Sequence, residues 1–180
     1  MGVETPAFQP TITVGAGTLP AGDYMVAVTY ISATGEEGGC DQNVIVTIPA
    51  ATTGSITLSG FPTPVDPTIS AIQIYFTDAN SATLRRWGRV PVGTASVAVD
   101  ATRLGAQIRT MFMSPMPPWQ AIAFAEGRLA VAEGTTVYFS EPFRIGMRNN
   151  PGFLLYSAQP TLLWGTPDGL YVAKIGRAHV

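Results

Sequence analysis

Hydrophobic and polar positions alternate along much of the first half of the chain. In the segment 24–31, Tyr24, Val26, Val28 and Tyr30 fall on one face of an extended backbone and the intervening residues fall on the other. A period of two in β-branched and aromatic residues predicts a strand. Because both faces of this segment are apolar, it fits a central strand of a β-sandwich. Turn-forming residues separate this segment from similar ones. The strands expected in this half are residues 12–14, 24–31, 44–48, 55–58, 71–77, 84–92 and 95–99.

Seven short strands separated by turn signals predict an immunoglobulin-like or fibronectin-like β-sandwich over residues 10–100. The Cys…Trp…Cys pattern of true immunoglobulin domains is absent, since Cys40 is the only cysteine. We expect no helix of three or more turns in this span. The residues expected in the core are Tyr24, Val26, Val28, Ile56, Leu58, Ile72, Ile74, Phe76 and Trp87.

The pattern changes in the second half. Residues 101–118 are rich in Met and Pro, which predicts an extended linker. Short strands are then expected at residues 121–124, 128–132, 137–140, 153–157, 161–164 and 170–173. Such a meander is typical of propeller blades, so residues 119–173 are predicted to form an incomplete β-propeller-like domain. Because a lone blade lacks neighbours, partial exposure is expected for Leu129, Val131, Val137, Phe139, Leu155, Leu163 and Leu170.

Composition adds a constraint on the surface. The chain is 46% hydrophobic and only 12% charged, about half the charged share of an average soluble domain. Such a surface fits a subunit packed into an assembly. Residues 1–84 contain no Lys, Arg or His, so specific nucleic-acid binding is not expected there. The chain shows no signal-peptide pattern and no apolar run of membrane-spanning length, so neither a signal peptide nor a transmembrane segment is expected.

Candidate chemistry in the sequence is sparse. A Ser-His-Asp arrangement needs a histidine base, and His179 is the only histidine. Glu36 and Glu37 are expected to be solvated on a turn. The segment 41–43 (Asp-Gln-Asn) offers oxygen ligands for Ca²⁺ but lacks a further acidic cluster. We therefore predict a protein that is not an enzyme and that has no catalytic, cofactor or metal site.

Other motifs have simple structural interpretations. Arg85, Arg86 and Arg89 surround Trp87, an arrangement that could stack on and neutralise a single-stranded nucleic acid. The favoured interpretation is that the arginine stems cover apolar surface while Trp87 lies in the core. Cys40 is expected to be inert. The segment 15–17 (Gly-Ala-Gly) lacks the helix that a phosphate site needs, and the Asp168-Gly169 pair is expected to form a turn.

The last seven residues, 174–180, resemble a translated sequencing adapter. They read Lys-Ile-Gly-Arg-Ala-His-Val, which resembles the translation of a common short-read sequencing adapter (AAG ATC GGA AGA GCA CAC GTC). We expect this segment to be a sequencing-adapter artefact. Lys174 and His179, the only Lys and His of the chain, would then not be native, and the chain would be a fragment of a longer protein.

Two stretches resemble the virion structural proteins of tailed bacteriophages. The first is LPAGDYMVAVTYISATGEEGG with AIQIYFTD, which is similar to fibronectin type III-like modules of such proteins. The second is IAFAEGRLAVAEGTTVYFSEPFRIGM with GFLLYSAQPTLLWGTPDGLYVA, which resembles β-propeller blades of tail-nozzle, hub and stabilisation proteins. Gly-Arg-Leu, Val-Tyr-Phe-Ser-Glu-Pro and Asp-Gly-Leu-Tyr-Val follow one another in that family's order.

The resemblance implies a structural role in a virion made in the bacterial host cytoplasm, by assembly and not by catalysis. Its implied partners are other virion or tail subunits, with a homo-oligomeric ring in the full-length protein. Two alternatives stay open: a carbohydrate-binding or adhesion module, and an accessory domain of a larger secreted or surface protein. Exposed aromatic platforms would favour carbohydrate binding, and Trp119 and Trp164 are the candidates.

Overall fold

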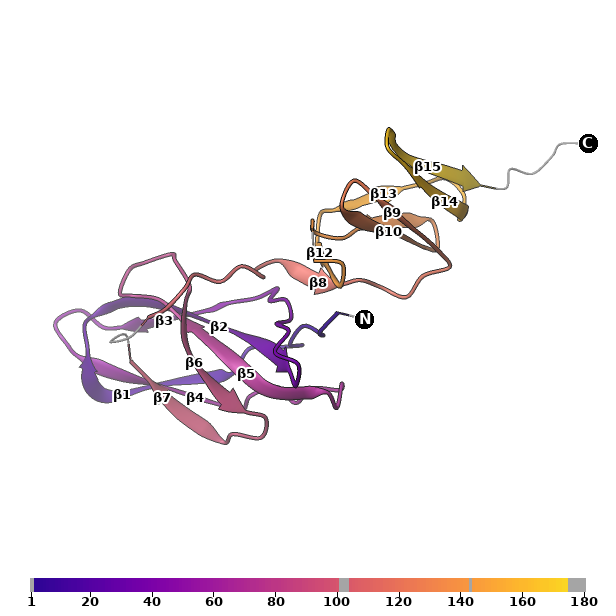
Figure 1. Cartoon of the computed structure of the whole chain (residues 1–180). Helices are drawn as coiled ribbons and strands as arrows, with labels where there is room; N and C mark the ends of the chain where they lie inside the picture. The colour runs from indigo at the N-terminus through magenta and orange to yellow at the C-terminus, as the bar shows by residue number, and fades with distance from the viewer. Residues whose placement is uncertain (1, 101–103, 143, 175–180) are drawn as a thin grey trace, which may run out of the picture. The chain divides into compact units, whose positions relative to one another are not determined.

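The protein is all-β, as the sequence pattern predicts (Figure 1). The computed structural model describes residues 2–100, 104–142 and 144–174, which contain fifteen strands and no helix, and therefore no apolar helix that could cross a membrane. The predictions for residues 101–103 and for the adapter-like segment from residue 175, with His179, lie outside the described residues. Two compact units are present: Val3–Phe112, here the sandwich unit, and Met113–Val180 with Met1–Gly2, here the C-terminal unit.

The sandwich unit consists of two antiparallel sheets. One sheet has the order β1-β4-β7 and the other β3-β2-β5-β6. All seven expected strands are confirmed, with bounds that differ by a few residues. The strands are β1 (Thr11–Leu19), β2 (Gly22–Ser32), β3 (Val44–Ile48), β4 (Gly54–Ser59), β5 (Ile69–Phe76), β6 (Arg85–Pro91) and β7 (Ser96–Val99).

Strand pairing in this unit follows most of the immunoglobulin-like arrangement. In that arrangement strand B pairs with E, while C′, C, F and G form the second sheet. Here β1 pairs with β4, and β3, β2, β5 and β6 lie side by side in that order, so β1–β6 match strands B, C, C′, E, F and G. β7 lies on the other edge of β4, where strand D lies in the constant-domain arrangement.

The main core lies between the two sheets. Eight of the nine residues predicted for it are fully buried there, and the rings of Tyr24 and Phe76 stack with centroids 5.2 Å apart. Trp87 is the exception, since it is half-buried and packs against the edge of the core. Its indole Nε1 donates a hydrogen bond to Asp100 Oδ1 over 3.3 Å, which explains why the polar edge of the ring stays near solvent.

A second, smaller core covers the outer face of the four-stranded sheet. It contains Ala27, Cys40, Tyr75 and Leu84, with Ile108 among the residues packed against it. The segment 104–112, within the predicted linker, lies along the edge of β6: Arg86 N donates to Ala106 O over 2.8 Å, and Ile108 N to Leu84 O over 3.0 Å. The described part of the predicted linker is thus divided, because residues 104–112 belong to the sandwich unit and the following residues to the C-terminal unit.

The C-terminal unit has a four-stranded antiparallel sheet of order β13-β11-β10-β9, a two-stranded ribbon that pairs β8 with the distant β12, and the hairpin β14/β15. The β14/β15 hairpin packs on one face of the sheet, where Ala130, Ala132, Val137 and Leu163 are buried together. The sequence pattern missed β8 and β12. The strands are β8 (Met113–Pro115), β9 (Ala121–Ala125), β10 (Arg128–Glu133), β11 (Thr136–Phe139), β12 (Met147–Asn149), β13 (Phe153–Leu155), β14 (Pro160–Thr166) and β15 (Gly169–Lys174).

The predicted exposure of this unit is partly wrong. Val131, Val137 and Leu163 are buried, Leu129, Phe139 and Leu170 are half-buried, and Leu155 is exposed. The β14/β15 hairpin covers one face of the sheet and takes Val137 and Leu163 out of water. Val131 lies on the opposite face, between Ile122 and Tyr138 in the strand register, and is buried there. Lys174, the first residue of the adapter-like segment, ends β15, and its Nζ donates to Ser157 Oγ over 2.9 Å.

Candidate interaction surfaces

The outward side of the β14/β15 hairpin is apolar and open to solvent. Trp164 and Tyr171 are directly opposite one another in the hairpin register and are 63% and 64% exposed, and Leu162 lies beside them on the same side. Alternation along each strand sends Leu163 to the buried side. We call Leu162, Trp164 and Tyr171 the hairpin face.

A second apolar surface lies on the side of the four-stranded sheet that the hairpin does not cover. Ile122 and Phe124 of β9 and Phe153 and Leu155 of β13 are exposed there, with Phe124 at 61% and Leu155 at 72%. These residues share one side of the sheet because directly paired residues point to the same side. The pairs Ile122–Val131, Val131–Tyr138 and Tyr138–Phe153 connect β9 to β13 through β10 and β11. We call Ile122, Phe124, Phe153 and Leu155 the sheet face.

The β8/β12 ribbon contributes a cation next to the sheet face. The Arg148 guanidinium lies over the Tyr138 ring, 4.6 Å from its centroid, and the Tyr138 and Phe153 rings are 6.2 Å apart. Contiguous exposed apolar residues mark interaction sites on soluble proteins. The hairpin face and the sheet face are therefore the strongest candidate functional surfaces of the described chain. The signal for the first was already in the sequence, since residues 162–164 put apolar side chains on both sides of a strand.

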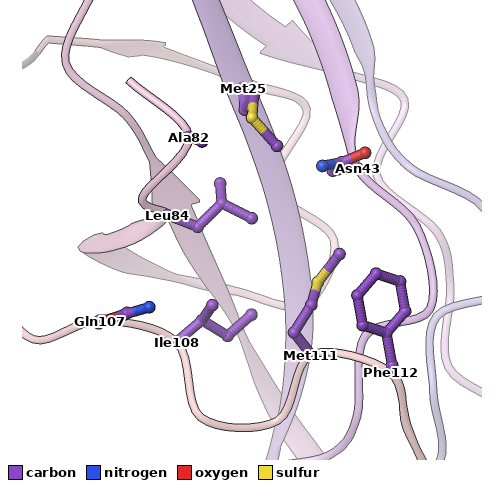
Figure 2. Close-up of a pocket in the computed structure, with 8 residues that line it drawn as sticks. All are labelled: Met25, Asn43, Ala82, Leu84, Gln107, Ile108, Met111 and Phe112. Carbon is purple, nitrogen blue, oxygen red and sulfur yellow. The ribbon is translucent and has the colours of Figure 1, made fainter.

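The sandwich unit carries a small pocket over its second core (Figure 2). Its volume is about 240 Å³, below the roughly 300–1,000 Å³ of small-molecule sites. Apolar side chains and two amides line it, and these offer hydrophobic contact and hydrogen bonds. The lining residues are Met25, Asn43, Ala82, Leu84, Gln107, Ile108, Met111 and Phe112.

Glu37 departs from the sequence-based expectation. Its Oε1 accepts hydrogen bonds from Thr29 Oγ1 over 2.7 Å and from the Tyr75 hydroxyl over 2.5 Å. Burial, together with the Glu37 carboxylate, holds the pKa of Tyr75 far above its usual range, although nearby Arg86 acts in the opposite direction. The prediction that both Glu36 and Glu37 are simply solvated is wrong for Glu37, because the turn directs this carboxylate toward two buried hydroxyls.

Cys40 and the acidic segment after it form no metal site within the described residues. No group of three or more His, Cys, Asp or Glu side chains there lies close enough to hold a metal ion. The Cys40 thiol is buried and donates to Gln42 O over 2.9 Å. Burial raises the pKa of this thiol to about 11, so the thiolate needed for nucleophilic chemistry is scarce at neutral pH.

The arginines around Trp87 do not frame a stacking platform. Arg85, Arg86 and Arg89 are exposed, but Trp87 packs against the sandwich core. The Gly-Ala-Gly segment 15–17 lies within β1 and pairs with β4 at Gly15 and Ala16, while Asp168 lies in the turn between β14 and β15. Of the two tryptophans proposed as platforms, Trp119 is exposed at 46% and Trp164 belongs to the hairpin face.

Comparison of the chain with models of known protein families and with curated proteins found no match.

Proposed function

We propose that this chain is a structural component of a tailed-phage virion, of the tail-nozzle, hub or DNA-stabilisation type, and that it acts by assembly and not by catalysis. The observation that carries the proposal is the pair of exposed apolar faces on the C-terminal unit. Burying such faces against another subunit removes apolar area from water, which is the dominant favourable term in protein association.

The architecture of both units supports this role. The sandwich unit has immunoglobulin-like strand pairing, in keeping with the resemblance to fibronectin type III-like modules. The C-terminal unit stacks a hairpin on a four-stranded antiparallel sheet, and a four-stranded sheet is the size of one propeller blade. Few charges on the chain reduce the desolvation cost of packing it among other subunits.

Mass spectrometry of purified particles tests the proposal. Tryptic cleavage at Arg128 and Arg144 releases the peptide of residues 129–144, which contains no further Lys or Arg before Arg144. We expect this peptide in nuclease-treated particles banded at virion density from the material that yielded the sequence. Its recovery only from cell-surface or secreted fractions would refute a virion role.

Carbohydrate binding is the second candidate, because Trp119 and Trp164 are exposed as a glycan platform requires. The neighbours of Trp164 on the hairpin face are Leu162 and Tyr171, which supply few of the directed hydrogen bonds that fix a sugar in place. Assembly is therefore favoured. Glycan-array binding that is lost in both Trp119→Ala and Trp164→Ala would reverse this preference.

A further inference from the structure

The C-terminal unit contains an internal repeat that the strand register reveals. In β9/β10, Ile122 pairs with Val131 and Ala123 with Ala130. In β14/β15, Leu163 pairs with Val172 and Trp164 with Tyr171. Every residue of the second hairpin in this register lies 41 positions after its equivalent in the first, as Ile122 and Leu163 illustrate. Leu-x-Val-Ala recurs at 129–132 and 170–173, so one hairpin unit occurs twice.

Equivalent residues lie on the same side of the hairpin in both copies. In the first copy, Ala123 and Ala130 point toward the buried cluster, and their equivalents Trp164 and Tyr171 point outward on the hairpin face. We call this the front of each copy. The back carries Ile122 and Phe124 in the first copy, exposed on the sheet face.

Within the chain, the front of the first copy packs against the back of the second. Leu163 of the second copy is buried with Ala130 and Ala132 of the first. Gly165 approaches the first copy so closely that a Cβ there would lie 2.0 Å from the Phe124 carbonyl oxygen. We call this interface between the two hairpins the seam, and in it the front of one copy packs directly against the back of the next. The stack ends in an uncovered front, the hairpin face, and in a back that is open at Ile122 and Phe124 on the sheet face but closed at Val131, which is fully buried.

We propose that a second copy of this chain docks head-to-tail, with the hairpin face of one chain on the sheet face of the next. The inference rests on the proposed assembly function and deepens it by naming the partner and the surfaces. The contact continues the front-to-back seam already present within the chain, and both of its surfaces are apolar. Because the two surfaces differ, the association is heterologous and continues into a ring or a filament.

The test uses the full chain and two single-face variants, Trp164→Ser on the hairpin face and Phe124→Ser on the sheet face. Sedimentation velocity over a wide concentration range should show concentration-dependent oligomers of the unmodified chain. Each variant should associate roughly thirtyfold more weakly, the scale of a truncated aromatic hot spot. The control Val65→Ser changes an exposed apolar residue of the sandwich unit and should leave association unchanged.

Mixing the two variants gives the decisive result. Each variant keeps one intact face, so the mixture should form one-to-one dimers and nothing larger. Association lost only in Trp164→Ser would indicate a symmetric contact of two hairpin faces and would overturn the inference. A monomeric unmodified chain would overturn it as well. Hydrogen exchange at β10, which holds the buried Val131, checks that the variants are folded.

The two proposals can fail separately. A chain that is present in virions but monomeric alone would refute head-to-tail docking and leave the virion role standing. A head-to-tail oligomer of a chain absent from virion particles would refute the virion role and leave the docking standing.

Discussion

Replacing Glu37 by alanine should destabilise the sandwich unit far more than the same change at Glu36. The Glu37 carboxylate accepts hydrogen bonds from the Thr29 and Tyr75 hydroxyls, and both of these residues are buried. Alanine leaves two buried donors without this acceptor. A lost hydrogen bond to a charged group costs about 1.5–3 kcal/mol. Glu37 is itself only half-buried, so water can replace part of the loss, and we expect about 2–4 kcal/mol in total.

Glu36 is the matched control, because it is the preceding residue and is exposed. Glu36→Ala should change the free energy of unfolding by less than about 0.5 kcal/mol, as surface substitutions usually do. Glu37→Gln should lie between the two alanine variants, since its amide oxygen can still accept one or both hydrogen bonds.

The assay is a urea titration followed by hydrogen exchange of peptides from β2 and β5. These strands hold Thr29 and Tyr75, so the signal reports the sandwich unit separately from the C-terminal unit. Equal unfolding free energies for Glu36→Ala and Glu37→Ala would refute the reasoning, because they would mean that the carboxylate contributes nothing to the buried hydroxyls.

Three further predictions use the same assay. Ile74→Ala should cost about 2–5 kcal/mol, because Ile74 is fully buried; the exposed Ile45→Ala is its control, and similar values for both would contradict the predicted core. Burial raises the pKa of the Cys40 thiol from 9.0 to about 11. The buried thiol therefore contributes its full stability below pH 9, and this contribution is lost as the pH rises toward 11, because the unfolded chain releases the thiol proton first. The Cys40→Ala variant should therefore lose less unfolding free energy than the unmodified chain between pH 9 and 11, and parallel pH profiles of the two proteins would refute this. Gly165→Val should raise exchange in β9 and β14, because its side chain would collide with the Phe124 carbonyl; unchanged protection would contradict the tight seam.

The sequence by itself determined thirteen of the fifteen described strands and eight of the nine predicted residues of the main core. A period of two is a local property, because successive side chains point to opposite faces of any extended backbone. The alternation at residues 24–31 therefore identified β2 and the side that carries Tyr24 and Val28. The same reasoning placed β5, with Ile74 and Phe76 inside. It also found β9, β10, β11, β14 and β15 with small errors at their ends.

Only the tertiary structure decided what covers each face. Both sides of β2 and of β14 are apolar in the sequence, so the pattern could not say which side meets a neighbour. The outer side of β2 is closed by residues 104–112, far away in the sequence. The inner side of β14 is closed by the β9/β10 pair, while Trp164 on its other side stays in solvent.

The same limit applies to single polar residues. Glu36 and Glu37 are chemically identical neighbours, and nothing local distinguishes the one that meets Thr29 and Tyr75. The 41-residue repeat was also hidden, because Ala123 and Ala130 are replaced by Trp164 and Tyr171 at equivalent positions. A front that is covered takes small side chains for close packing, and a front that is open carries large aromatic ones. The sequence alone shows only the short Leu-x-Val-Ala recurrence, and the strand register extends the equivalence to both strands of each hairpin.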